Sequence, residues 1–266
     1  MPIAPTAPAR LNYELHGAPD APLLILAHSL GSDLSMWDEQ ADALAAYFRV
    51  LRYDARGHGR SGAPPGPYTL PDMGQDVIAL MDHLQAPRAH FCGLSMGGLV
   101  GQWLALHHPR RLSSLAACNT AARVGTAQGW AGRAAQVQQL GMPALAAQVV
   151  PRWFSPDFAQ AAPARMAALQ AVFSDTPAHG YIATCQALAE ADLRGRLGEI
   201  ATPTLVVGGT HDLSTPPAQA HELAHGIAGA ELVLLPTGHL SNVEQPADFN
   251  AALLAFLQQA GEGATR

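Results

Sequence analysis

Charged side chains are scarce in this chain of 266 residues. Asp, Glu, Lys and Arg together make up 14% of it, the formal charge is −6, and no long run of either sign occurs. Proteins that attract nucleic acid electrostatically carry clustered basic residues. The composition therefore argues against a nucleic-acid partner.

Cysteine is also rare. Its three copies, Cys92, Cys118 and Cys185, stand in apolar surroundings and lack the paired spacing of a zinc site or a disulfide framework. Cysteines used in this way suit a reducing compartment. The 12 histidines show no zinc-type cluster, so we expect no bound metal.

Long apolar stretches are absent as well. No segment offers about 18 uninterrupted apolar residues, the minimum for a membrane-spanning helix. The first residues lack the basic segment and apolar stretch of a secretory signal peptide. We expect a cytoplasmic protein with no membrane partner.

Short apolar runs alternate with helical patterns along most of the chain. This alternation predicts an α/β fold, in which a mostly parallel sheet has helices on both faces. Hydrophobic residues make up 48% of the chain, which is enough for strands buried on both faces. The expected strands are residues 23–27, 49–53, 90–93, 112–118, 204–207 and 231–235, and the clearest helices are residues 71–84, 97–107, 217–227 and 246–259.

The strand signal disappears in residues 120–197. This segment has Ala-, Gln- and Arg-rich helical patterns instead, interrupted at residues 141–143 and at three further prolines. The length of the chain allows one α/β core with an insertion. We therefore predict a core formed by residues 1–119 and 198–266, with residues 120–197 as an inserted helical cap.

One motif places a serine between a strand and a helix. Residues 93–97 read Gly-Leu-Ser-Met-Gly, which fits G-x-S-x-G, with an apolar strand before it and a helical pattern directly after it. A sharp turn in this context strains the backbone and exposes the hydroxyl, so Ser95 is the candidate nucleophile. The alternative is a glycine-rich turn that fits the motif by chance, and the flanking strand and helix argue against it.

A serine nucleophile needs a base, and the base needs a carboxylate that orients it. His239 follows the last expected strand and completes the order Ser, Asp, His; the alternative is a histidine of a surface loop. Asp212 lies just beyond the preceding strand, so its side chain should reach the same sheet edge. Asp54 also follows a strand and is the rival acid, although its glycine-rich surroundings suit a structural turn.

Acyl transfer also needs backbone N–H groups that stabilise an oxyanion. Met96 directly follows Ser95, and Leu30 lies in the loop after an early strand. These two positions supply the donors in this architecture, so we expect the oxyanion hole at the Leu30 and Met96 backbone. All of these groups come from the protein, so we expect no cofactor.

The sequence also resembles a known family over nearly its whole length. Residues 53–61, Tyr-Asp-Ala-Arg-Gly-His-Gly-Arg-Ser, are similar to the α/β-hydrolase superfamily. Residues 90–99, 118–123, 152–154 and 239–246 are similar to one of its families, the 3-oxoadipate enol-lactonases. The resemblance implies an α/β-hydrolase fold and hydrolysis of 3-oxoadipate enol-lactone to 3-oxoadipate, through an acyl-enzyme, in the β-ketoadipate pathway of aromatic compound degradation.

The implied substrate carries a carboxylate, so its pocket should contain a cation. Trp130 and Arg133 lie three residues apart and would share one face of a cap helix, where we expect them to bind the substrate. The alternative is an ordinary helix with a packed tryptophan and a solvent-exposed arginine. Arg123, Arg152 and Trp153 are further candidates for this role.

Two other functions fit the same residues. A general carboxylesterase or a haloperoxidase-like perhydrolase would use the same three groups without a carboxylate-binding arginine. A ligand-binding protein would share only the fold, and the intact set of Ser, Asp and His argues against it. The expected partner is a small lactone, and a homo-oligomer is compatible with the sequence.

Overall fold

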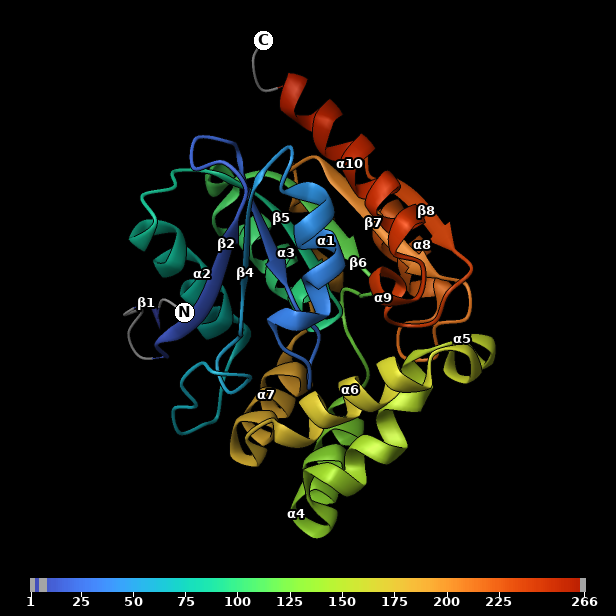
Figure 1. Ribbon diagram of the computed structural model, residues 1–266. Helices are drawn as coiled ribbons and strands as arrows, with labels where there is room; N and C mark the ends of the chain where they lie inside the picture. Colours follow the sequence, from blue (N-terminus) through green and yellow to red (C-terminus); the bar gives the residue numbers. More distant parts are fainter. Residues whose placement is uncertain (1–2, 5–8, 264–266) are drawn as a thin grey trace.

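The computed structural model describes residues 3–4 and 9–263, so residues 1–2, 5–8 and 264–266 of the predicted core lie outside the described residues. Within the described part, eight strands form one sheet in the order β1-β2-β4-β3-β5-β6-β7-β8 (Figure 1). They are β1 (Ile3–Ala4), β2 (Leu11–His16), β3 (Leu23–Ala27), β4 (Arg49–Tyr53), β5 (Ala89–Leu94), β6 (Leu112–Cys118), β7 (Thr204–Gly209) and β8 (Glu231–Leu235). β2 pairs antiparallel with β1 and β4, and all other neighbours are parallel, which confirms the predicted fold class.

The burial of the strands explains which of them the sequence predicts. β3 and β5 are buried along their whole length, and a strand covered on both faces needs apolar side chains at consecutive positions. β2 instead alternates apolar and polar residues, and its last three residues are only half-buried. A continuous apolar run therefore predicts the parallel strands but not the antiparallel edge formed by β1 and β2.

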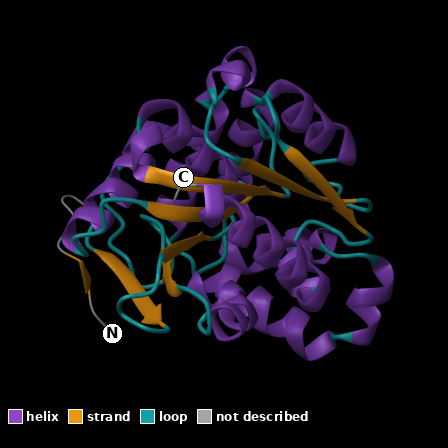
Figure 2. Ribbon diagram, turned by 90° about the horizontal axis from the view of Figure 1, so that it is seen from above, coloured by secondary structure: helices purple, strands orange, loops and turns teal. Residues whose placement is uncertain are grey.

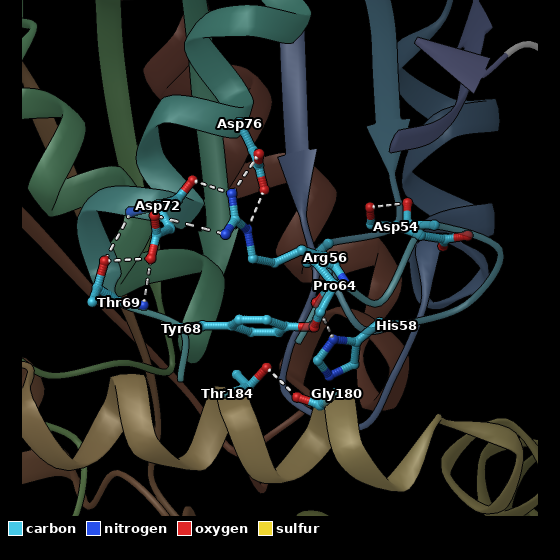
Figure 3. Close-up of polar contacts among 12 residues, drawn as sticks. Asp54, Arg56, His58, Pro64, Tyr68, Thr69, Asp72, Asp76, Gly180 and Thr184 are labelled. Carbon is cyan, nitrogen blue, oxygen red and sulfur yellow. Dashed lines mark hydrogen bonds and ion pairs between the residues drawn. The ribbon is translucent and has the colours of Figure 1, made fainter. Parts of the chain in front are cut away.

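Helices lie on both sides of the sheet (Figure 2). Outside the segment between β6 and β7 they are α1 (Asp38–Leu44), α2 (Leu70–His83), α3 (Met96–His107), α8 (Pro217–Gly226), α9 (Ser241–Glu244) and α10 (Pro246–Gly263). α1 packs against α10, and α2 packs against α3. A capping box between Thr69 and Asp72 begins α2 and satisfies N–H groups that a first helical turn leaves without acceptors (Figure 3). None of the helices in the described ranges is both long and apolar enough to cross a membrane.

The fully described segment between β6 and β7 contains four α-helices, α4 (Ala127–Val149), α5 (Pro156–Ala161), α6 (Pro163–Asp175) and α7 (Ala178–Glu190). The predicted interruptions are present, since Gly141 has a non-helical φ of 76° and α5 and α6 begin at Pro156 and Pro163. Proline suits a first turn because its missing N–H would have no acceptor there. Figure 1 shows these helices together beyond one end of the sheet. We call α4–α7 and the turns between them the cap, while the predicted domain boundaries stay a prediction.

The cap helix α7 contacts the core where two glycines face each other. A Cβ atom at Gly180 would lie 2.6 Å from the Gly57 Cα, closer than real side chains come. Beside this contact, Figure 3 shows Tyr68 between Arg56 and α7, and the Arg56 Cζ lies 5.4 Å from the centre of the Tyr68 ring. Asp76 accepts two hydrogen bonds from Arg56, at 2.6 and 2.8 Å. The absence of side chains at Gly57 and Gly180 lets α7 approach the core this closely. Beside this contact, Asp76 holds Arg56 against the Tyr68 ring.

The substitution Gly180→Ala should destabilise the protein, because the added methyl group forces α7 away from Gly57. We expect the free energy of unfolding to fall by about 1–3 kcal/mol, as is usual for overpacking. The matched control is Gly132→Ala in α4, where nothing lies within 4 Å of an added Cβ. It should stabilise by about 0.5–1 kcal/mol through helix propensity. Urea unfolding measures both values, and equal effects of the two substitutions would contradict the glycine contact.

Candidate active site

Ser95 occupies the turn between β5 and α3. Its backbone has φ 56° and ψ −112°, a conformation that residues with side chains rarely adopt. The turn leaves no room for Cβ atoms on either side of it. One at Gly93 would lie 2.2 Å from the Gly97 oxygen, and one at Gly97 would lie 2.3 Å from the Ala27 oxygen. This turn holds Ser95 at the C-terminal edge of the sheet, where it lines a cavity.

His239 and Asp212 form a buried pair. The His239 Nδ1 lies 2.8 Å from Asp212 Oδ2, and the Asp212 oxygens also accept from the Ser214 N–H, the Thr215 N–H and the Thr215 hydroxyl at 2.7–2.9 Å. Burial by itself raises the pKa of Asp212, but the His239 imidazole and the Thr215 hydrogen bonds outweigh it and lower the pKa below its usual value. An ionised Asp212 accepts the proton on Nδ1, which leaves Nε2 as the basic nitrogen of His239.

Asp54, the rival acid, is engaged in the core. Its carboxylate accepts hydrogen bonds from the Leu34 N–H, the Arg60 N–H and the Asn12 amide, each at 2.8 Å. It therefore organises the loops after β3 and β4, as its glycine-rich surroundings suggest. The described contacts of Asp54 include none with His239.

The two expected oxyanion donors come from different loops. Leu30 lines the cavity, and Met96 begins α3, where a first helical turn has N–H groups without intrahelical acceptors. The loop that carries Leu30 is held by a buried histidine, since the Gly31 N–H donates to His58 Nε2 at 3.1 Å. Burial and the neighbouring His28 lower the pKa of His58 to about 3, so Nε2 stays an acceptor at neutral pH.

Ser95 and His239 open onto one cavity of about 240 Å³ between the sheet edge and the cap. Its described walls contain two arginines, Arg133 and Arg152, and no Asp or Glu. Neither arginine forms an ion pair with a carboxylate in the described part of the chain. The cavity is therefore locally positive in a protein whose formal charge is −6.

The structure brings Trp130 and Arg133 to the same wall of this cavity. Both are half-buried, and the Trp130 Nε1 donates to the Val124 carbonyl at 2.7 Å. Arg133 donates to the Tyr181 hydroxyl at 3.3 Å. Tyr181 reaches the cavity from α7, three helices further along the cap, and no local sequence pattern indicates this contact.

The other candidates for substrate binding divide into two groups. Arg152 and Trp153 also line the cavity, from the turn between α4 and α5. Arg123 is not among the described lining residues, and it forms an ion pair with Asp192 at 3.4 Å. Arg123 is therefore the one candidate whose charge is already matched outside the cavity.

Asn119 also contacts the site, although the sequence pattern of a catalytic triad does not include it. It follows β6 with a positive φ of 42°, which asparagine tolerates better than most residues. Its amide donates to Asp212 Oδ2 at 3.2 Å and to the Gly238 carbonyl at 3.1 Å. An asparagine directly after a buried strand was the available signal, but its partners lie more than ninety positions away along the chain.

Side chains that could bind a metal are dispersed. Within residues 3–4 and 9–263, no three His, Cys, Asp or Glu side chains come together as they would around an ion. The Sγ atoms of Cys92 and Cys118 lie 3.8 Å apart, and both residues are buried. Burial raises the pKa of Cys118, which keeps its thiol protonated and a poor ligand.

Comparison with known proteins defines the family. A family profile described as alpha/beta hydrolase fold matches residues 22–246. The 3-oxoadipate enol-lactonase 2 of Acinetobacter baylyi is 45% identical over 249 residues, which cover 94% of this chain and 93% of the relative. The crystal structure of the enol-lactonase from Burkholderia xenovorans LB400 has a TM-score of 0.95 and 47% identity, covering 97% of this chain and 100% of that chain. A putative carbamate hydrolase, RutD of Variovorax paradoxus, is 35% identical over 93% of this chain and 96% of its own length.

The chain belongs to the α/β-hydrolase fold family. Within that family it is a hydrolase that acts on an ester, and its resemblance to the enol-lactonases is confirmed. The roles of individual residues in the cavity stay predictions.

The substitution Thr215→Val removes a hydroxyl that donates to Asp212 and nearly keeps the side-chain size. We expect the free energy of unfolding at pH 7 to fall by about 1.5–3 kcal/mol, as for a hydrogen bond to a charged group. Because the folded-state pKa of Asp212 is lowered, this stabilisation is present above the usual carboxyl pKa of about 3.9 and is lost as the pH falls through the folded value. Urea unfolding of both proteins from pH 7 to pH 2.5 measures the trend.

The control is Thr184→Val, whose hydroxyl donates to the neutral Gly180 carbonyl at 2.9 Å (Figure 3). Its loss should destabilise equally at every pH. If the loss in free energy of unfolding caused by Thr215→Val did not change with pH, as expected for the control, Asp212 would not be the ionised acceptor described above.

Proposed function

We propose that this protein hydrolyses 3-oxoadipate enol-lactone to 3-oxoadipate, a step of the β-ketoadipate pathway. The observation that carries the proposal is one cavity lined by Ser95, His239 and two arginines, with no acidic side chain among the described walls. Asp212 bonds to His239 from outside these walls. Relatives named enol-lactonases, which cover most of the chain, support the same substrate.

In the proposed mechanism, Ser95 Oγ attacks the lactone carbonyl while His239 Nε2 accepts the serine proton. Asp212 is ionised and buried, so it stabilises the imidazolium that forms. Negative charge develops on the carbonyl oxygen, where the Leu30 and Met96 N–H groups act as donors. Collapse of the tetrahedral intermediate opens the ring and leaves an acyl-enzyme.

The departing enolate oxygen stays tethered to the acyl chain, so the ring could close again. His239 holds the proton that it took from Ser95, and its transfer to this oxygen gives the enol and opposes closure. Tautomerisation to the more stable ketone has the same effect. Water then attacks the acyl carbonyl with His239 as the base, which releases the product and restores Ser95.

The free carboxylate of the substrate would bind at the arginine-containing wall. A guanidinium matches a carboxylate with two parallel hydrogen bonds, and Arg133 is oriented by Tyr181 at 3.3 Å. Trp130 offers an apolar surface beside it for the carbon chain. The positive cavity also favours entry of an anion that the rest of this acidic protein repels.

The substitution Ser95→Ala should abolish turnover. We expect kcat to fall on the order of 10⁴-fold or more, because the base and its carboxylate do little without the nucleophile. The loss of ultraviolet absorbance of freshly generated enol-lactone measures the rate, and Ser113→Ala, outside the described cavity walls, is the control. If the wild type leaves the lactone intact but cleaves a neutral p-nitrophenyl ester, the protein is a general carboxylesterase.

The substitution Arg133→Ala should impair binding of the anionic lactone only. Loss of a hydrogen-bonded charge corresponds to an increase in KM of about 10-fold to 100-fold, with little change for a neutral p-nitrophenyl ester. Arg123→Ala is the matched control, because Arg123 pairs with Asp192 away from the described cavity walls. Equal losses on the charged and the neutral substrate would contradict a carboxylate-binding role for Arg133.

A further inference from the structure

The loop that carries His239 is bonded to the cap. The His239 and Leu240 N–H groups donate to the Trp153 carbonyl at 2.6 and 3.3 Å. Gly238, just before them, packs so closely that a Cβ atom there would lie 2.5 Å from the same carbonyl. The backbone around His239 is thus held by residues of the cap as well as by its own strand.

A carboxylate completes this junction. Glu244, the last residue of α9, accepts a hydrogen bond from the Gly238 N–H at 2.8 Å. The same carboxylate accepts from the Ser155 N–H at 3.3 Å and from the Ser155 hydroxyl. Ser155 is the N-cap of α5, and Figure 1 shows α5 next to α9. The half-buried Glu244 therefore connects the base-bearing loop with the first turn of a cap helix.

This junction joins two functional surfaces. On the cap side, Arg152 and Trp153 line the cavity. The Trp153 carbonyl is itself bonded to the His239 loop, and Ser155 follows two residues later. On the core side, His239 lines the same cavity. The mechanism described above assigns no role to Glu244, although the segment at residues 239–246 is one of those that resemble the lactonase pattern.

We propose that Glu244 is a positioning residue, whose carboxylate fixes the His239 loop against the cap so that the imidazole keeps its productive place in the cavity. The proposal rests on the proposed function, in which His239 is the base. Asp212 holds only the Nδ1 side of the ring, whereas the place of the ring also depends on the backbone at residues 238–240. Hydrogen bonds to a carboxylate are about twice as strong as neutral ones, which suits a contact between the loop after β8 and the turn before α5.

Loss of the Glu244 carboxylate would leave donors unmatched on both sides, at the buried Gly238 and the half-buried Ser155. The Gly238 N–H would lose its acceptor, and Ser155 would lose the partner of its N–H and hydroxyl. A loop relaxed in this way displaces its side chain, and a displacement of about 1 Å at a reacting group can slow a reaction on the order of 100-fold. Loss of the Glu244 carboxylate should therefore lower the reaction rate by a larger factor than it lowers the equilibrium constant for folding.

The test uses diisopropyl fluorophosphate, a small neutral reagent that needs the base but no carboxylate anchor. Ser95 Oγ attacks phosphorus, the P–F bond breaks, fluoride leaves, and the serine proton passes to His239. We expect Glu244→Ala to react about 10-fold to 100-fold more slowly than the wild type. Glu244→Gln keeps an acceptor for Gly238 and a donor for the Ser155 hydroxyl, so its rate should stay close to that of the wild type.

The outcomes separate this proposal from the proposed function. A wild type that does not react, or a Ser95→Ala variant that does, would overturn the serine mechanism itself. A Glu244→Ala variant that reacts at the wild-type rate but has a raised KM for the lactone would show that Glu244 serves the cap alone, which overturns positioning of His239. A Glu244→Gln variant as slow as Glu244→Ala would overturn positioning through hydrogen bonds.

Two further variants keep the test informative if Glu244→Ala does not fold. Ser155→Ala removes the hydroxyl at the other end of the junction, and it should also slow the reaction. Because Glu244→Gln keeps a partner for this hydroxyl, Ser155→Ala should slow the reaction to a similar extent in the Glu244→Gln and the wild-type backgrounds, and a Ser155→Ala variant that reacts at the wild-type rate would overturn the proposal. Asp248→Ala removes an exposed carboxylate in the first turn of α10 and should react like the wild type.

Discussion

The backbone of Ser95 is the constraint on which the site depends. A residue at φ 56° and ψ −112° is strained, so its surroundings must hold it in place. β6 and the loop after it do so on one side, since the Ser95 N–H donates to the Cys118 carbonyl at 2.9 Å and the Thr120 hydroxyl donates to the Ser95 carbonyl at 2.7 Å. Glycine on either side of the turn lets α3 approach the sheet. Ser95, the proposed nucleophile, is thus placed by packing of the core, and its backbone hydrogen bonds come from residues outside α4–α7.

His239, the proposed base, is placed differently. It lies in a loop after β8, a strand that is only partly buried, although Gly238, His239 and Leu240 are themselves buried. In the core, Asp212 contacts the ring, while Asn119 and Glu244 bond to the Gly238 backbone. In the cap, the Trp153 carbonyl accepts from the His239 N–H. The proposed nucleophile is therefore held by the core alone, whereas the proposed base is bonded to the cap as well.

How far the sequence predicts this arrangement depends on the range of the interactions. Ser95 and Asp212 follow from local patterns, because one strand ends directly before Ser95 and another ends three residues before Asp212. β2 and α1 escape prediction, the first because it alternates at an antiparallel edge and the second because seven residues give too short a periodic pattern. Glu244 could not be assigned a partner at all, because its contact with Ser155 spans 89 positions and exists only once the cap has packed on the core.

The division between core and cap also bears on specificity. Relatives that carry different names, an enol-lactonase and a putative carbamate hydrolase, each match more than nine-tenths of this chain, so the fold alone does not set the substrate. In this protein the described cavity receives both of its arginines, Arg133 and Arg152, from the cap, while Ser95 and His239 come from the core. The proposed catalytic groups and the proposed carboxylate-binding groups therefore lie on separate parts of the chain. Because the His239 loop is bonded to the cap segment next to Arg152, a substitution at that wall should also act on the position of His239.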